Sequence, residues 1–379
     1  MKLNTIHIVV LLIGSFLLGT ISAEPNGAVL YRNGKRLGHI NVSPTAEHHY
    51  FGYLEGPAWE NRYCAFRCYV DKDDRNALDI IGKLKEEPIL QYFTDTTVDE
   101  HTTWPWGTDI LKVNSSMGLG AFRLLVNGTW INPQIPETLD SLTVTIVDST
   151  TATPTVKLEY FGWNIGGGQK ITAYWKIYTS AEEHATHCEL TIDGNFNGKV
   201  VAGMVNHKEN TSNPNRSTIT LTQQETPPLL ATLGKQGGLS EGFDDTLLMA
   251  IFCPENYFDS FVKNGTSDYG MALKPDADGK VEWSIAYSWA REVHPLFRKS
   301  DWKEKLVAAT ALKELPHIAP VAHQPKDLRI NDIATENVFS LDGKTLRQGA
   351  VHQVPGVYIV KTPDHTRSKT ALTNSAATR

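Results

Sequence analysis

Seven residues of the sequence have side chains suited to proton transfer beside a carboxylate group. Two histidines can accept a proton, an arginine and an asparagine can hold a carboxylate, and a glutamate or a tyrosine can protonate a departing oxygen. These residues are His101, His187, Arg67, Asn61, Glu60, Tyr174 and Tyr160. The pattern leaves open which of the two histidines is the base and whether Arg67 or Asn61 holds the carboxylate. Together they predict a site that abstracts a proton next to a carboxylate.

Each of these residues also has a structural interpretation. Glu60 could pair with Arg62 at a strand end, and His187 could be a histidine whose partners lie within a sheet. The sequence contains no HExxH and no glycine loop that cradles phosphate. The constellation is therefore a hypothesis of grouped side chains and not a catalytic motif.

The stretch Glu55–Asp71 carries three of the candidates. From Trp59 onward it alternates with period two, which predicts one strand over 59–71. One face of that strand would be apolar, and the other would present Trp59, Asn61, Tyr63, Ala65, Arg67, Tyr69 and Asp71. Rings and a guanidinium on one face are what a sugar acid needs from a binding surface. The alternative is an ordinary solvated strand face.

An aromatic loop follows at His101–Asp109, where Trp104 and Trp106 flank a proline. Loops carry function more often than frameworks do, and tryptophan rings stack on the CH faces of pyranoses. We predict that Trp104, Trp106 and Asp109 bind substrate, as do Asn61, Tyr160 and Trp163. The alternative is a loop that its own aromatic rings hold to the surface.

The chain from 122 to 295 alternates in many short segments separated by Gly, Asn and Pro turns. The clearest segments lie at 142–147, 156–161, 170–178, 187–193, 199–205, 247–252 and 281–289. They predict an all-β fold, a large antiparallel β-sandwich with few short helices. Tyr174 and His187 fall on the polar faces of two of these strands.

Four divisions of the chain are expected. Residues 1–23 have the basic start, short apolar run and small residues of a signal peptide. The sandwich domain would span 24–315 and close with a helix whose capping box is Asp301 and Glu304. A linker at 316–329 and a small C-terminal β segment at 330–379 would follow, with a hairpin signal at Asp342-Gly343.

Composition narrows the possible ligands. The formal net charge is −6 without basic clusters, which argues against nucleic acid as a partner. The four cysteines lack metal-site spacing, and we predict no metal and no cofactor. The cysteines are expected to be small buried hydrophobes, with a bridge from Cys64 or Cys68 to Cys188 or Cys253 as the alternative.

Short motifs of the chain resemble a known family. These are Trp59-Glu-Asn61 followed by Ala65-Phe-Arg67, then His101 eight residues before Asp109, then Gly118-Leu-Gly120. They resemble a family of exported bacterial proteins catalogued mainly as a domain of unknown function, which includes an ulvan oligosaccharide dehydratase. The likeness covers roughly residues 28 to 312.

The resemblance implies a supersandwich like that of mutarotase and lyase domains, and a carbon–oxygen lyase. Such an enzyme eliminates water from the non-reducing-end uronic acid of an oligosaccharide and leaves a 4,5-unsaturated sugar. It implies roles for Glu60, Asn61, Arg67, His101 and Asp109. The expected partner is a uronic-acid oligosaccharide, without a membrane span.

Three functions stay open at this point. The first is the dehydratase, the second is a polysaccharide lyase or glycoside hydrolase on the same fold, and the third is a carbohydrate-binding protein without activity. The C-terminal segment also resembles those of exported Bacteroidetes proteins, which implies a periplasmic or cell-surface location.

Overall fold

The computed structural model describes residues 27–43, 50–71, 76–94, 102–133, 138–236 and 244–310, together with the strand residues 337–339, 345–346, 356–361 and 368–373. The chain divides into two compact units, Met1–Leu312 and Lys313–Arg379. The predicted signal peptide and His101 lie outside the described residues. No helix among the described residues is long and apolar enough to cross a membrane.

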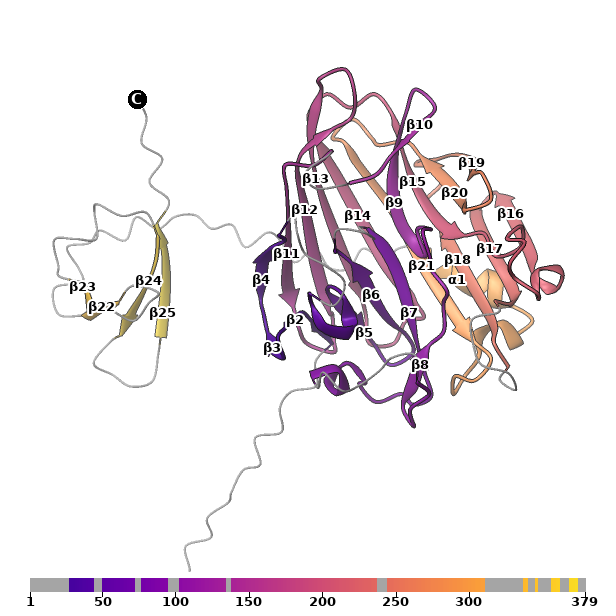
Figure 1. Cartoon of the computed structure of the whole chain (residues 1–379), viewed down its shortest axis with the longest axis horizontal. Coiled ribbons are helices and arrows are strands. Elements are labelled where there is room, and N and C mark those ends of the chain that lie inside the picture. The colour runs from indigo at the N-terminus through magenta and orange to yellow at the C-terminus, as the bar shows by residue number, and fades with distance from the viewer. Residues whose placement is uncertain are drawn as a thin grey trace, which may run out of the picture. The chain divides into compact units, whose positions relative to one another are not determined.

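A nine-stranded antiparallel sheet, which we call the large sheet, forms one layer of the first unit (Figure 1). Its order is β16-β17-β18-β21-β14-β13-β12-β11-β4. The strands are β4 (His39–Asn41), β11 (Ser141–Asp148), β12 (Thr155–Asn164), β13 (Lys170–Thr179), β14 (Ala185–Asp193), β16 (Thr220–Glu225), β17 (Pro228–Lys235), β18 (Thr246–Phe252) and β21 (Lys280–Trp289). The predicted all-β antiparallel sandwich is confirmed, and the strand segments from 142 to 289 lie where their alternation places them.

Two five-stranded sheets form the opposite layer. The N-terminal sheet has the order β1-β5-β6-β7-β8, with β1 (Ala28–Val29), β5 (Ala58–Glu60), β6 (Ala65–Tyr69), β7 (Ala77–Lys83) and β8 (Gly107–Asp109). The lateral sheet has the order β10-β9-β15-β20-β19, with β9 (Leu119–Val126), β10 (Thr129–Ile131), β15 (Lys199–Val205), β19 (Phe258–Asn264) and β20 (Asp268–Leu273). A bridge between Leu78 and Gly118 joins the two sheets edge to edge.

The core lies between these two layers. Its largest fully buried side chains include Trp59 and Phe66 from the N-terminal sheet and Trp175, Trp283 and Trp289 from the large sheet. Polar contacts also cross it. The indole nitrogen of Trp59 donates to Thr186 Oγ1 at 3.3 Å, and that of Trp283 donates to the Gly120 carbonyl at 2.9 Å. Each sheet therefore has one face on the core and one face turned away from it.

The predicted continuous strand over 59–71 is wrong, because the chain turns back at Asn61. β5 and β6 are the two arms of a hairpin, with Glu60 opposite Ala65 and Ala58 opposite Arg67. The Asn61 side chain accepts the backbone N–H groups of Tyr63 and Cys64, both at 2.9 Å, and so stabilises the turn. Both arms of a hairpin alternate with period two, so the alternation alone does not distinguish a hairpin from one long strand.

Short elements complete the unit. The Asn33-Gly34 hairpin predicted near the start is confirmed as β2 (Tyr31–Arg32) and β3 (Lys35–Arg36), with positive φ at both turn residues. The 3-10 helices are η1 (Gly52–Leu54), η2 (Leu90–Thr94), η3 (Arg216–Thr218) and η4 (Leu296–Arg298). The predicted helix is α1 (Trp302–Thr310), and its Leu306 packs with η4 on the outer face of the large sheet.

The second unit contains a four-stranded antiparallel sheet of order β23-β22-β24-β25. Its strands are β22 (Asn337–Phe339), β23 (Thr345–Leu346), β24 (Gly356–Lys361) and β25 (Ser368–Thr373). β22 pairs with β23, as a hairpin around the predicted Asp342-Gly343 turn requires, although that turn lies outside the described residues.

All four cysteines are buried and unbridged. Cys64 ends the β5–β6 turn, Cys68 lies on β6, and both belong to the main core, as do Cys188 and Cys253. The prediction of small buried hydrophobes is confirmed over the alternative of a disulfide.

Candidate functional site

The outer face of the N-terminal sheet gathers charged residues that are distant in the sequence. Pairing places Arg67 on β6 opposite Asp79 on β7, and Ile81 opposite Asp109 on β8. Side chains two residues apart on a strand share a face. Arg67, Asp79 and Asp109 therefore point to the same side, away from the core that Phe66 and Ile80 fill on the other side.

The Arg67 guanidinium is buried and binds three carboxylates. Its Nε and Nη2 donate to Asp79 at 3.0 and 2.7 Å, and Nη2 also donates to Asp109 at 3.0 Å. Its Nη1 donates to the Tyr53 carbonyl at 2.5 Å and lies 3.7 Å from a Glu55 carboxylate oxygen. These contacts engage all three nitrogens of the guanidinium with groups of the protein. The role predicted for Arg67 therefore changes, because the residue is 1% exposed and orders acids of the protein, out of reach of a substrate carboxylate.

Tyr69 extends this group toward solvent. Its hydroxyl donates to Asp79, and its ring lies under the Arg67 guanidinium at 5.0 Å. The residue is partly exposed, whereas Arg67 and Asp79 are each only 1% exposed. Burial, and then the Asp79 charge, raise the pKa of Tyr69 well above its ordinary value. Tyr69 therefore carries its proton at neutral pH at the margin of a buried charge cluster. We call Arg67, Tyr69, Asp79 and Asp109 the acid cluster.

Asp109 is the carboxylate of the acid cluster that reaches the surface. Its side chain is 11% exposed, while one oxygen binds Arg67 and the other accepts the Leu111 backbone N–H at 3.1 Å. Asp109 thus lies at the outer face of the N-terminal sheet, and its role in binding substrate stays a prediction.

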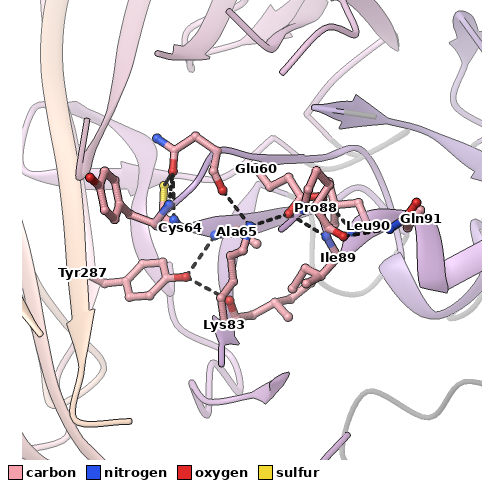
Figure 2. A network of polar contacts seen from close by, with 12 residues as sticks. Glu60, Cys64, Ala65, Lys83, Pro88, Ile89, Leu90, Gln91 and Tyr287 are labelled. Carbon is pink, nitrogen blue, oxygen red and sulfur yellow. Dashed lines mark hydrogen bonds and ion pairs between the residues drawn. The ribbon is translucent and has the colours of Figure 1, made fainter. Parts of the chain in front are cut away.

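Glu60 lies on the same face but has a closed environment. Its carboxylate accepts the backbone N–H groups of Ile89 and Leu90 at 2.8–2.9 Å and binds the Lys83 ammonium at 2.8 Å. Figure 2 shows these donors converging on Glu60 at the start of η2. Burial raises the pKa of Glu60 against the opposing effect of Lys83. Glu60 thus anchors η2 to the sheet and is not positioned as a catalytic acid.

Asn61 also has a structural role. Its amide NH₂ contacts Thr179, Ser180 and Glu183 at 2.6–2.8 Å, while its oxygen holds the hairpin turn. The Lys83 ammonium donates to the backbone carbonyl of Asn61 at 2.7 Å. Every polar group of this side chain therefore joins the β5–β6 turn to the loop after β13, and none is left for a ligand.

An aromatic group adjoins the acid cluster. Trp104 and Trp106 are parallel, with ring centroids 6.4 Å apart, and Tyr92 also stacks on Trp106, with centroids 5.7 Å apart. Trp106 belongs to one buried cluster with Ala65 and Ile81, and these two residues lie two positions from Arg67 and Asp79 on the same face of the sheet. Tyr92 is 39% exposed and Trp104 is partly exposed. We call these three rings the aromatic stack. Trp106 is only 7% exposed, which fits the alternative of a loop held by its own aromatic rings, and substrate binding by Trp104 stays a prediction.

His187 and Tyr174 lie on the opposite side of the sandwich. Both belong to strands whose inner neighbours, such as Thr186 and Trp175, face the core, so both point outward from the large sheet. Packed sheets are about 10 Å apart, and outward side chains add to that separation. The prediction that His187 and Tyr174 share a site with Arg67 is therefore wrong.

His187 does form a chain of polar contacts with a serine and a glutamate. Its Nδ1 lies 2.9 Å from Ser284 Oγ and its Nε2 lies 3.0 Å from the Glu183 carboxylate. Ser284 lies in mid-strand and pairs with His187 on one side and Phe252 on the other. Its neighbouring backbone N–H groups belong to these two ladders and cannot form an oxyanion hole. The chain therefore satisfies a sheet histidine and is not a hydrolytic triad.

Tyr160 and Trp163 were predicted to bind sugar, but both are fully buried. They lie on the inner side of β12 at 0% exposure and pack against Phe122 in the main core. A bulge between Tyr160 and Trp163 keeps both rings on the same side of the strand, although their spacing is odd. Their predicted role is wrong, because a strand pattern does not show which face meets the core.

The sequence also missed Tyr69 and Asp79 as site residues. Tyr69 follows Arg67 by two residues, and Asp79 is the acid inside an otherwise apolar segment at 78–82. A buried acid requires a partner of opposite charge. Asp79 in an apolar segment could therefore have predicted a contact with a cation such as Arg67. Within the described parts of the chain, no cluster of three or more His, Cys, Asp and Glu side chains could hold a metal ion.

The fold and site define an antiparallel β-sandwich protein whose buried acid cluster shares a sheet face with a partly exposed group of aromatic rings. The sequence matches the family described as "Domain of unknown function (DUF4861)" over residues 20–315. The chain belongs to this family, which confirms the expected resemblance to a family of unknown function. None of the curated proteins compared with the chain matches it.

Among solved structures, the chain is similar to one described as a kojibiose phosphorylase from the human microbiome. The TM-score is 0.45 at 10% sequence identity, over 77% of this chain and 37% of that one. The chain thus spans just over a third of that protein, and the likeness is a distant one of fold.

Proposed function

We propose that this protein is a carbohydrate-active lyase, a dehydratase that eliminates water from the non-reducing-end uronic acid of an oligosaccharide. The observation that carries the proposal is that the acid cluster and the aromatic stack share the outer face of one sheet. Rings that present flat faces suit pyranoses, and a proton-bearing group beside them suits the departure of a hydroxyl group.

The reaction needs one base and one acid. A base removes the proton from C5 of the uronic acid, the C4–O bond breaks, and the oxygen leaves as water after it takes a proton. The electrons of the C5–H bond become the C4–C5 double bond. We assign the acid to Tyr69, because it is partly exposed at the margin of the acid cluster, where a leaving hydroxyl group can reach its phenol. Burial and the Asp79 charge raise the pKa of Tyr69, and the nearby Arg67 charge opposes them and so favours release of the proton.

His101 is assigned as the base on the motif that places it eight residues before Asp109. Its unperturbed pKa lies near neutral pH, which suits general-base catalysis. Asp109 is the residue of the acid cluster whose carboxylate reaches the surface. We assign it to hold a sugar hydroxyl group.

The carboxylate geometry disfavours a glycoside hydrolase. Such an enzyme places two carboxyl groups across the scissile bond, at about 5–9.5 Å from one another. Asp79 and Asp109 are bridged by one Arg67 nitrogen, so no sugar fits between them. Glu60 is enclosed by its own partners, and Glu189 lies on the outer face of the large sheet with Lys176.

A binding protein without activity is the second candidate, because the aromatic stack alone suits that function. A binding surface needs exposed rings but does not need a buried arginine with three carboxylates. We also propose an exported location, periplasmic or at the cell surface, from the basic and apolar pattern of residues 1–23.

The proposal is tested by incubating the protein with uronate-terminated oligosaccharides. The expected product has lost one water in mass and gains the ultraviolet absorbance of a conjugated double bond. His101→Ala is expected to keep oligosaccharide binding and to lose at least about 100-fold in turnover.

Other products would contradict the proposal in distinct ways. A gain of one water in mass would identify a hydrolase, and cleavage to a shorter chain with an unsaturated end would identify a polysaccharide lyase. Binding without any product, in the wild-type protein and the variant alike, would identify the binding protein.

A further inference from the structure

A polar groove lies at the end of the sandwich where β14 meets β15. Its volume is about 850 Å³, within the range of about 300–1,000 Å³ that is usual for ligand sites. Three loops form its walls, at 125–128, 192–199 and 274–279. No site residue discussed above lines it.

The walls of this groove are fixed by the protein's own hydrogen bonds. Asp276 accepts the N–H groups of Asp278 and Lys280, both at 2.9 Å, and so closes the third loop. The Ile192 N–H donates to the Gly279 carbonyl at 2.9 Å, which ties the second loop to the third. A ligand would therefore meet a preformed surface and would not have to order it.

Six exposed polar side chains of the groove make no hydrogen bond or ion pair within the described chain. They combine amides that donate and accept, carboxylates that accept, and one ammonium, and they are Asn127, Asp193, Asn195, Asn197, Lys274 and Asp278. Sugar hydroxyl groups donate and accept at once, so they pair with such planar groups over a wide area. Two carboxylates against one ammonium disfavour an anionic ligand.

One aromatic ring completes the surface. Phe196 is partly exposed, lines the groove and packs against the main core. Gly198 permits this position, because a Cβ there would lie 2.9 Å from the Phe196 ring and 2.8 Å from the Leu125 carbonyl. A ring fixed at a polar groove gives the CH face of a sugar an apolar contact.

We propose that this groove binds a neutral oligosaccharide, at a site separate from the acid cluster. The N-terminal sheet meets β14 at Thr186, and the groove begins at Ile192, six residues further along the strand. At about 3.3 Å per residue, the groove lies about 20 Å from that contact. The site would hold a neutral part of a glycan while the acid cluster acts elsewhere.

The test is calorimetric titration of the full chain with gluco-, manno-, xylo- and galacto-oligosaccharides of two to six units. At least one is expected to bind, and the double variant Asn195→Ala/Asn197→Ala is expected to raise its Kd at least about tenfold. Gln223→Ala, which removes an exposed amide from β16 outside the groove, is the matched control and should leave Kd unchanged. Asp278→Ala gives a second, independent groove variant.

The proposal is overturned if no neutral oligosaccharide binds, or if both groove variants bind as the wild type does. These outcomes are independent of turnover at the acid cluster. A protein that binds through the groove but never releases water from a uronate would refute the proposed function and leave this inference standing.

Discussion

The outer faces of the N-terminal sheet and the large sheet have similar residue types but different charge arrangements. On the N-terminal sheet, one buried arginine binds carboxylates from three separate segments. On the large sheet, exposed lysines pair with nearby acids, as in Lys157–Glu159 and Lys176–Glu189. Burying the charges of the first arrangement costs desolvation free energy, which the rest of the fold must offset. The second arrangement stays in contact with water and has little such cost. The comparison teaches that convergence and burial, more than residue type, distinguish the candidate site.

The largest expected effect comes from removing the central cation of the acid cluster. Arg67→Met would leave buried carboxylates without their counter-charge and should lower the free energy of unfolding by about 3–5 kcal/mol. Urea unfolding followed by tryptophan fluorescence measures this loss. Arg67→Lys keeps the charge but loses the planar guanidinium with its several donors. Its free energy of unfolding should lie between those of Arg67→Met and the wild type. A loss below about 1 kcal/mol for Arg67→Met would show that the acid cluster depends on its cation no more than a surface ion pair does.

A smaller effect concerns Glu292, a buried acid that is hydrogen-bonded to Ser288 on the outer face of the large sheet. Glu292 accepts hydrogen bonds from Ser288 and from the Leu296 N–H, and burial raises its pKa to about 7. The folded state therefore retains a proton that the unfolded state releases near pH 4.5. Stability should fall as pH rises from about 4.5 to 7, by about 3 kcal/mol in total.

Glu292→Gln tests that sign, because the amide cannot titrate. Unfolding measured across this pH range should lose most of its downward slope in the variant, while the wild type keeps it. A wild-type contribution from Glu292 that is flat or rises with pH would contradict the assignment.

A change at His187 separates the two faces by activity. His187→Gln should cost about 1 kcal/mol of stability, because it disturbs the contacts with Ser284 and Glu183. Turnover of a uronate-terminated oligosaccharide should stay within about twofold of the wild type. Loss of turnover with the fold intact would move the active face to the large sheet.

The smallest expected effect is at a surface ion pair. Lys176→Ala breaks a contact of 3.5 Å between side chains that are 47% and 26% exposed. The expected change is at most about 0.5 kcal/mol, and it should shrink further with added salt. A loss comparable to that of Arg67→Met would erase the distinction between the two faces.

Period-two alternation was enough to predict the sandwich because half-buried antiparallel strands impose it on the sequence. It also placed Arg67 and Tyr69 on the same face of β6. It could not reveal the Asn61 turn, since the alternation is the same in both arms of a hairpin.

The site required information that one strand does not contain. Arg67 and Asp79 meet through strand register, and His187 is excluded because its strand belongs to the other layer. Similarly, Tyr160 and Trp163 have the residue types of a sugar site, but the bulge in β12 turns both to the core. Layer and register arise from long-range pairing, which is why these assignments could not be made from local pattern.

The most direct test compares two tyrosines, one on each outer face. Tyr69→Phe and Tyr174→Phe each remove one hydroxyl group, and circular dichroism can verify that both variants are folded. The account predicts that Tyr69→Phe loses at least about 100-fold in the release of water from a uronate-terminated oligosaccharide, while Tyr174→Phe retains wild-type turnover. Full turnover in Tyr69→Phe, or loss of turnover in Tyr174→Phe alone, would contradict it.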